Sequence, residues 1–125
     1  MAGTLVISTL SDGTNSTSAT NPIRGGAKVW VNFNGNTAAI RASYNVTSVT
    51  RNSTGNYTIT FTNSLGSASY CAVLGGAYTL NASGERNFLA TTENYGSGSS
   101  LQIICTDPTN GSQLDMEVVN AACFV

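Results

Sequence analysis

The chain has 125 residues and a formal net charge of −1, which fits a single domain without the basic footprint of a nucleic-acid or anionic-lipid surface. Hydrophobic residues make up 41% of the chain and charged residues only 9%, against roughly 25% charge in an average soluble domain. The chain has no histidine, which excludes a Ser/His/Asp or Cys/His catalytic triad.

The N-terminal segment, residues 1–27, predicts a strand followed by a linker arm. Residues 4–10 are apolar and β-forming, whereas residues 11–27 are rich in turn formers and show no period. There is no basic and apolar signal segment and no apolar run near the length of a membrane span, so we expect a protein made in the cytoplasm.

The next segment, residues 28–62, predicts three half-buried strands with alternating apolar side chains. Turns are expected at residues 34–36 and 51–56, where Gly55 can adopt a positive φ. The side chains predicted to face inward are Val29, Val31, Phe33, Ile40, Ala42, Tyr44, Val46, Tyr57, Ile59 and Phe61.

The second half of the chain predicts further short strands and no helix of ordinary length. They are expected at residues 70–74, 78–80, 88–92, 101–106, 114–119 and 121–125. Many short strands with regular turn signals indicate an all-β fold, namely an antiparallel β-sandwich or jelly-roll-like domain over residues 28–125.

Several predicted strands are apolar on both faces, notably residues 70–74 and 101–105. A monomeric sandwich keeps its outer faces polar, so this excess predicts a second buried surface formed by self-association. Trp30 shares its face with Lys28 and Asn32, and three interpretations stay open: a contact between subunits, a second core layer, or a platform for a ligand.

The ionisable residues and thiols favour structural over catalytic roles. Asp115 and Glu117 are expected on the wet face of one strand, with a polar subunit contact or an acid pair or cation site as the alternatives. No segment has the spacing of a metal site, and no cofactor is expected. The three cysteines, Cys71, Cys105 and Cys123, are expected to be buried free thiols, although a Cys71 to Cys105 bridge is the alternative.

The loops of the second half contain residue types that bind sugars. Aromatic rings offer an apolar face to a sugar ring, and amide or charged groups hydrogen-bond its hydroxyls. The candidate receptor-contact residues are Tyr78, Arg86, Asn94 and Tyr95.

Several stretches of the chain resemble the C-terminal tip domain of bacteriophage tail fibres. They are AKVWVNFNGN, IRASYNVTSVTRNSTGNYTITFTN, the ending VVNAACFV and the N-terminal TLVISTLSDGTNS. The resemblance implies a virion protein that forms a parallel homotrimer at the end of a fibre, attached to an upstream tail fibre or baseplate protein. It also implies binding to a host-cell glycan or outer-membrane protein, without enzymatic activity.

Trp30 and Phe124 are the candidate residues of such a trimer interface. Whether residues 1–27 pack on their own subunit or on a neighbour is left open. Rival functions are a purely structural virion protein, such as a fibre cap or capsid decoration, a small polysaccharide depolymerase using Asp115 and Glu117, and a lectin-like module of a cellular protein.

Overall fold

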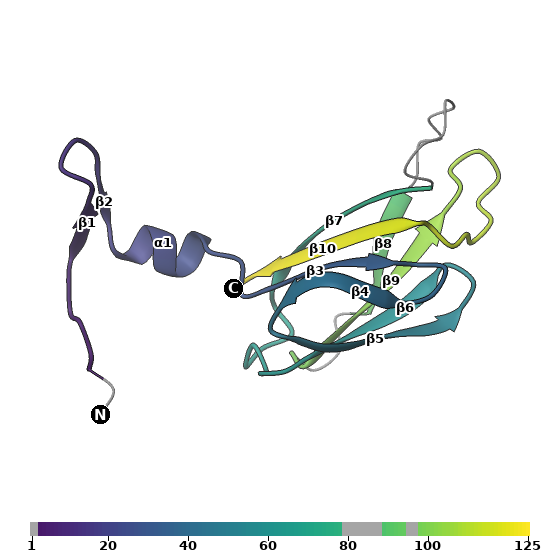
Figure 1. Cartoon of the computed structure of the whole chain (residues 1–125), viewed down its shortest axis with the longest axis horizontal. Coiled ribbons are helices and arrows are strands. Elements are labelled where there is room, and N and C mark those ends of the chain that lie inside the picture. The colour runs from purple at the N-terminus through teal and green to yellow at the C-terminus, as the bar shows by residue number, and fades with distance from the viewer. Residues whose placement is uncertain (1–2, 79–88, 95–97) are drawn as a thin grey trace.

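The protein is a β-sandwich with an N-terminal arm that stands away from one end of it (Figure 1). The computed structural model describes residues 3–78, 89–94 and 98–125. One antiparallel sheet, called the β3 sheet, contains in spatial order β4 (Ala39–Tyr44), β3 (Val29–Asn34), β10 (Val118–Phe124) and β7 (Cys71–Ala77). The other, called the β6 sheet, contains β5 (Val46–Ser53), β6 (Asn56–Phe61), β9 (Ser100–Thr106) and β8 (Leu89–Asn94). The predicted all-β, antiparallel fold is therefore confirmed.

The core lies between the two sheets and comes from the alternating side chains of the central strands. Each such apolar side chain contributes about 1.5–3 kcal/mol when it leaves water. Edge-to-face ring pairs connect Phe33 with Tyr57 and Phe61 with Tyr70, with ring centroids 5.2 and 5.9 Å apart. The buried strand residues are Val29, Val31, Phe33, Tyr57, Ile59, Phe61, Leu101, Ile103, Cys105, Val119, Ala121 and Cys123.

The turn between β5 and β6 depends on Gly55. Its φ of +69° is the left-handed conformation that side chains disfavour, and a Cβ there would lie 2.6 Å from the Cys105 carbonyl oxygen. The predicted positive φ at Gly55 is confirmed, but the loop is shorter than residues 51–56, because β5 continues to Ser53 and β6 begins at Asn56.

The chain crosses from the β3 sheet to the β6 sheet at Asn45, which has a φ of +57°. Asparagine tolerates this conformation because its short amide can bond to nearby backbone. The Asn45 Nδ2 donates to the carbonyl oxygens of Lys28 and Asn63, and its Oδ1 accepts from the Asn63 backbone N–H at 2.8 Å. The crossing therefore also ties the two sheets together at the end of the sandwich next to the arm.

The arm contains a small hairpin of β1 (Thr9–Ser11) and β2 (Ser16–Ser18), followed by the short helix α1 (Thr20–Gly25) of six residues. The strand predicted over residues 4–10 is wrong for residues 4–8, which lie in no strand. The hairpin partner β2 is only three residues long and pairs with nothing before Thr9. Lys28 Nζ donates to the Ile23 carbonyl and so connects α1 to the sandwich.

The two strands predicted near the C-terminus, residues 114–119 and 121–125, are one strand, β10, which begins at Val118. Asn120 does not interrupt it, because its Oδ1 accepts a 2.6 Å hydrogen bond from Asn32 Nδ2 on β3. Residues 114–117 instead cross the end of the sandwich opposite the arm, where Met116 is fully buried and its carbonyl accepts the Gly35 N–H.

The predicted burial was wrong at two edge strands. All six residues of β4 are exposed, including Ile40, Ala42 and Tyr44, because β4 is the last strand of its sheet. Cys71 on β7 is also exposed rather than buried. All three cysteines are free, so the alternative Cys71 to Cys105 bridge is absent, and the two residues lie in different sheets.

The predicted strand at residues 78–80 is not formed at Tyr78, which follows the end of β7 in a bend, and residues 79–80 lie outside the described residues. The strand expected at residues 88–92 corresponds to β8, which begins at Leu89.

Candidate interaction surface

An apolar row crosses the outer face of the β3 sheet, from one edge strand to the other. Trp30 on β3 is paired in register with Tyr44 on β4 on one side and with Ala122 on β10 on the other. Ala122 is in turn paired with Val73 on β7. Side chains at register positions on one face are direct neighbours. Four strands that are distant in sequence thus build one continuous feature, which we call the apolar row.

The apolar row is open to solvent in the single chain. Trp30 is 40% exposed, Tyr44 58% and Val73 56%, and Ala122 is partly exposed. Phe124 and Cys71, register partners on the same sheet, lie beside the row toward the arm end of the strands, and Phe124 is half-buried. On the other side of the row, the bonded pair Asn32 and Asn120 marks the start of a polar zone.

Trp30 therefore lies on the outer face of the subunit and not in its core, which rules out the second core layer as its place within one chain. A contact between subunits and a ligand platform remain as interpretations. Tyr44 and Val73 are neighbours that the sequence analysis missed as members of this surface. For Tyr44 the pairing with Trp30 was the missing information, since alternation alone does not say which face of an edge strand is outward.

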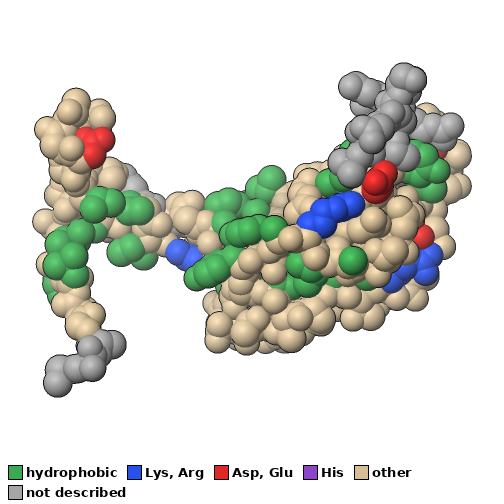
Figure 2. Space-filling view, viewed as in Figure 1, with side chains coloured by type: hydrophobic (Ala, Val, Ile, Leu, Met, Phe, Trp, Pro, Cys, Tyr) green, Lys and Arg blue, Asp and Glu red, His purple; other side chains and the backbone are tan. Residues whose placement is uncertain are grey.

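The arm carries a second exposed set of apolar side chains. Leu5 is 81% exposed and Val6 is 88% exposed, and Ile7, Leu10 and Ile23 are also exposed. Figure 2 shows hydrophobic side chains along the arm and on the part of the sandwich nearest to it. An isolated two-stranded hairpin is marginally stable in water, so the arm lacks the packing that would hold it on its own.

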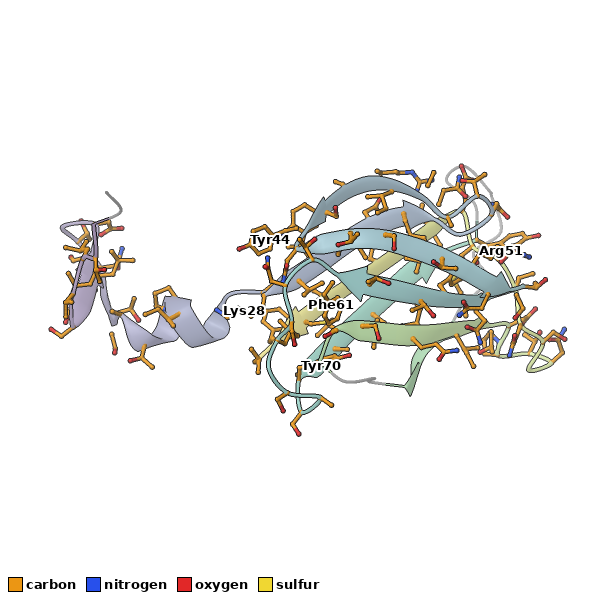
Figure 3. All side chains as sticks on the ribbon, turned by 90° about the horizontal axis from the view of Figure 1, so that it is seen from below. Lys28, Tyr44, Arg51, Phe61 and Tyr70 are labelled. Atoms are coloured by element: carbon orange, nitrogen blue, oxygen red, sulfur yellow. The ribbon has the colours of Figure 1, made fainter. Side chains whose placement is uncertain are left out.

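Asp115 is an anchor of the end opposite the arm, called here the distal end. Its carboxylate accepts hydrogen bonds from Arg51 Nη2 at 2.7 Å, from Tyr57 Oη at 2.6 Å and from the Gly55 N–H at 2.8 Å. Figure 3 shows Arg51 at this end, far from Lys28 and Tyr44. These bonds tie the β5–β6 turn to the segment that leads into β10.

The electrostatics of Asp115 follow from these contacts. Partial burial by itself raises the pKa of Asp115, but the bonds from Arg51, Gly55 and Tyr57 outweigh it and hold the pKa below its ordinary value. Burial, reinforced by the bond to Asp115, raises the pKa of Tyr57 well above its usual range. Asp115 is therefore an ionised structural group whose oxygens are already occupied.

The predicted placement of Asp115 and Glu117 on the wet face of one strand is wrong. Both residues precede β10, and Asp115 is largely covered rather than solvated. The backbone N–H of Glu117 donates to the Tyr78 carbonyl, and the backbone carbonyl of Glu117 accepts from the Arg41 guanidinium. Over residues 3–78, 89–94 and 98–125, no three acidic, Cys or His side chains gather as a metal site.

The four predicted receptor-contact residues do not come together in the described part of the chain. Tyr78 is exposed and follows the distal end of β7. Asn94 ends β8 opposite Gln102, near the arm end of β9, so its backbone lies at the other end of the sandwich. Arg86 and Tyr95 lie outside the described residues. Each of the four stays a prediction, but Tyr78 and Asn94 belong to different ends.

A cavity of about 530 Å³ opens at the arm end of the sandwich. Its walls include Lys28, Tyr44 and Val125, together with Asn45 and residues 62–65. Figure 3 shows Lys28 and Tyr44 on this side, where α1 joins the sandwich. The cavity combines an aromatic ring with amide and hydroxyl groups, and its size is in the range of small-ligand sites.

Comparison of the chain with protein-family models, with curated proteins and with solved structures finds no match. Within the described residues, no helix has the length and apolar character needed to cross a membrane. The interpretation of this surface therefore rests on the chain's own residues.

Proposed function

We propose that the protein is the receptor-binding tip of a bacteriophage tail fibre, acting as a non-enzymatic homotrimer that binds a glycan or outer-membrane protein of its host bacterium. The observation that carries the proposal is the apolar row of Tyr44, Trp30, Ala122 and Val73. Such a surface on a charge-poor protein favours association between identical copies, which hides it from water. The fibre-like sequence motifs add the virion context.

The two ends of the subunit differ in a way that suits a fibre tip. The arm leaves from one end, and the β3–β4, β5–β6 and β9–β10 connections gather at the distal end (Figure 1). Residues 108–113 are all exposed there, and Tyr78 adds an exposed aromatic ring. We infer attachment to the upstream fibre or baseplate protein through the arm, and receptor contact at the distal end, in a virion assembled inside the bacterium.

Three copies would also multiply a weak contact. Rigidly linked sites raise avidity by factors of order 100 or more without any new contact, which suits adhesion to a repetitive surface glycan.

Oligomeric state is the first test. Light scattering at micromolar concentration should give about three times the 12.9 kDa mass of one chain. A stable monomer would contradict the proposal.

Receptor binding is the second test. Fluorescently labelled protein should bind saturably to some strains of a bacterial panel, and a glycan array should identify the sugar class. Tyr78→Ala should weaken binding about tenfold, which is about 1.4 kcal/mol, and should leave the trimer intact. The control variant Thr60→Ala, on the outer face of the β6 sheet, should change neither binding nor the trimer. Binding that is not saturable on any strain would reject receptor recognition.

A second candidate is a purely structural virion protein, such as a fibre cap or capsid decoration. The apolar row favours it equally, because a structural trimer needs the same buried surface. It differs in one outcome: the protein should form the trimer and show no saturable, strain-dependent binding to cells.

A further inference from the structure

We propose that residues 4–8 of one copy pair as an added β-strand with the edge strand β7 of a second copy. This inference rests on the proposed trimer and specifies how its copies are joined. It also assigns a role to an N-terminal segment that has no partner strand among the described residues of its own chain.

The donor segment is Thr4 to Ser8, with the sequence TLVIS. Its β-branched and apolar residues favour a strand, yet it lies in no strand of its own subunit. Leu5 and Val6 are the two most exposed large apolar side chains of the described residues. The Ser8 carbonyl accepts the Ala19 N–H at 2.9 Å, whereas residues 4–7 take part in no strand pairing among the described residues. A β-forming segment that is exposed and largely unpaired is suited to pairing with a sheet edge elsewhere.

The acceptor is identified by comparing the four edge strands. The strands β4, β5 and β8 each carry a charged residue, Arg41, Arg51 and Glu93 respectively, and each shows a register shift against its neighbour. Charges and bulges are devices that block the addition of another strand. In contrast, β7 contains no charged residue and no proline, and pairs with β10 in unbroken register over seven residues.

The β7 edge also has the right surroundings. Two side chains of β7 are exposed: Val73, which ends the apolar row, and Cys71, which lies beside the row. An added strand would therefore extend the apolar face of the β3 sheet by one strand. Within its own chain, the donor segment lies beyond the β1–β2 hairpin and α1, away from β7 (Figure 1). The geometry therefore points to a second copy as the occupant.

Cysteine cross-linking in the full chain tests the pairing, because Cys71 is an exposed thiol on β7 whereas Cys105 and Cys123 are buried. Leu5→Cys, Val6→Cys and Ile7→Cys are oxidised one at a time and run on a non-reducing gel. Successive side chains of a strand alternate between faces, and a disulfide forms only between directly opposed residues whose Cα atoms lie within about 7 Å. We therefore expect linked chains from one face of the segment only, that is from residue 5 or 7, or else from residue 6.

The controls separate other arrangements. Adding Cys71→Ser to each variant should abolish the link, and links that persist would mean contact between arms and overturn the proposal. Linking of all three variants, of none, or within one chain without a change in mass would overturn it as well.

A second variant tests the backbone pairing. Val6→Pro removes an N–H and disfavours ladder pairing, while residue 6 takes part in no strand pairing among the described residues of its own subunit. We expect the dissociation constant of the trimer to rise at least tenfold, with no change for the matched variant Gly3→Ala. An unchanged constant for Val6→Pro would overturn the added strand. If the wild-type chain is a trimer in that case, the proposed function survives and only this inference fails.

Discussion

The outer faces of the two sheets differ sharply although the strands are similar in composition. On the β6 sheet, the outward positions carry hydroxyl and amide groups that bond to one another: Asn52 Nδ2 donates to Thr58 Oγ1 and Gln102 Nε2 donates to Asn56 Oδ1. On the β3 sheet, the corresponding positions carry the apolar row. The outer face of the β6 sheet is thus polar and suited to water, whereas that of the β3 sheet is apolar and suited to contact with protein.

This difference shows why an excess of apolar residues cannot be assigned from single strands. The sequence predicted a surplus on both residues 70–74 and 101–105. On β9 the outward Ile104 has Asn56 as its register partner, so it stands beside a polar residue. On β7 the outward Val73 continues into Ala122 and Trp30. Only the register turns scattered apolar residues into a surface.

The largest expected effect separates the outer face of the β3 sheet from the core between the two sheets. Cys71 should react with a thiol reagent several hundred times faster than Cys123, and faster still relative to Cys105. Burial raises the pKa of Cys105 to about 12 and that of Cys123 to about 11, which at pH 8 leaves about one thiolate in a thousand or fewer.

Mass spectrometry after timed labelling measures these rates. Because the apolar row is expected to be covered on assembly, Cys71 labelling should slow as protein concentration rises. A Cys71 rate that is independent of concentration would mean that this face stays open.

The next effect compares one charge on each outer face. Val73→Asp should weaken self-association at least a hundredfold, about 3 kcal/mol, because the interface would bury an unpaired carboxylate. The matched variant Thr60→Asp, on the polar face of the β6 sheet, should leave association unchanged. Sedimentation over a range of concentrations measures both, and equal effects would remove the distinction between the faces.

A smaller effect is expected at the distal end, which takes no part in the apolar row. Asp115→Asn should lower the free energy of unfolding by about 1–2 kcal/mol, because charge-assisted bonds from Arg51, Gly55 and Tyr57 are weakened. Urea denaturation measures it, with Asp12→Asn in the arm as the control. Loss of association in Asp115→Asn would contradict the separate roles of the two regions.

The smallest effect is a pH dependence. A carboxyl whose pKa is lowered by folding stabilises the protein above its unfolded pKa, about 3.9, and this contribution is lost as the pH falls from about 4 through the lowered value. Urea midpoints measured between pH 6 and pH 2.5 should therefore decline most below pH 4. The decline should be shallower in Asp115→Asn, and parallel curves would show that another group dominates.

The central strands could be predicted from the sequence, because each is buried on one side and alternates strictly. Val29, Val31 and Phe33 or Tyr57, Ile59 and Phe61 signal their own inward face. The exposure of β4 could not be predicted, because its sequence alternates like a central strand and only its place at the sheet edge leaves it uncovered.

The candidate site was predicted only in part. Trp30 and Phe124 were predicted as residues of an associating surface, which stays a prediction, and the structure places both on the outer side of the β3 sheet. Their neighbours come from other strands through register. The structural role of Asp115 depends on its ion pair with Arg51, which is 64 residues away in sequence. A local sequence pattern therefore cannot predict this role.

The two-sheet tie at Asn45 has a mechanical consequence for a protein held by its arm. A pull along the arm enters the sandwich at Lys28, the residue before β3, and β3 is flanked by β4 and β10, so their shared hydrogen bonds are loaded lengthwise and together. Asn45 hydrogen-bonds to the Lys28 carbonyl and to the backbone of Asn63. Force applied at Lys28 is therefore shared with the β6 sheet before the strands of the β3 sheet can separate. A domain anchored in this way resists being pulled apart under load, which the proposed role as an adhesive tip would require.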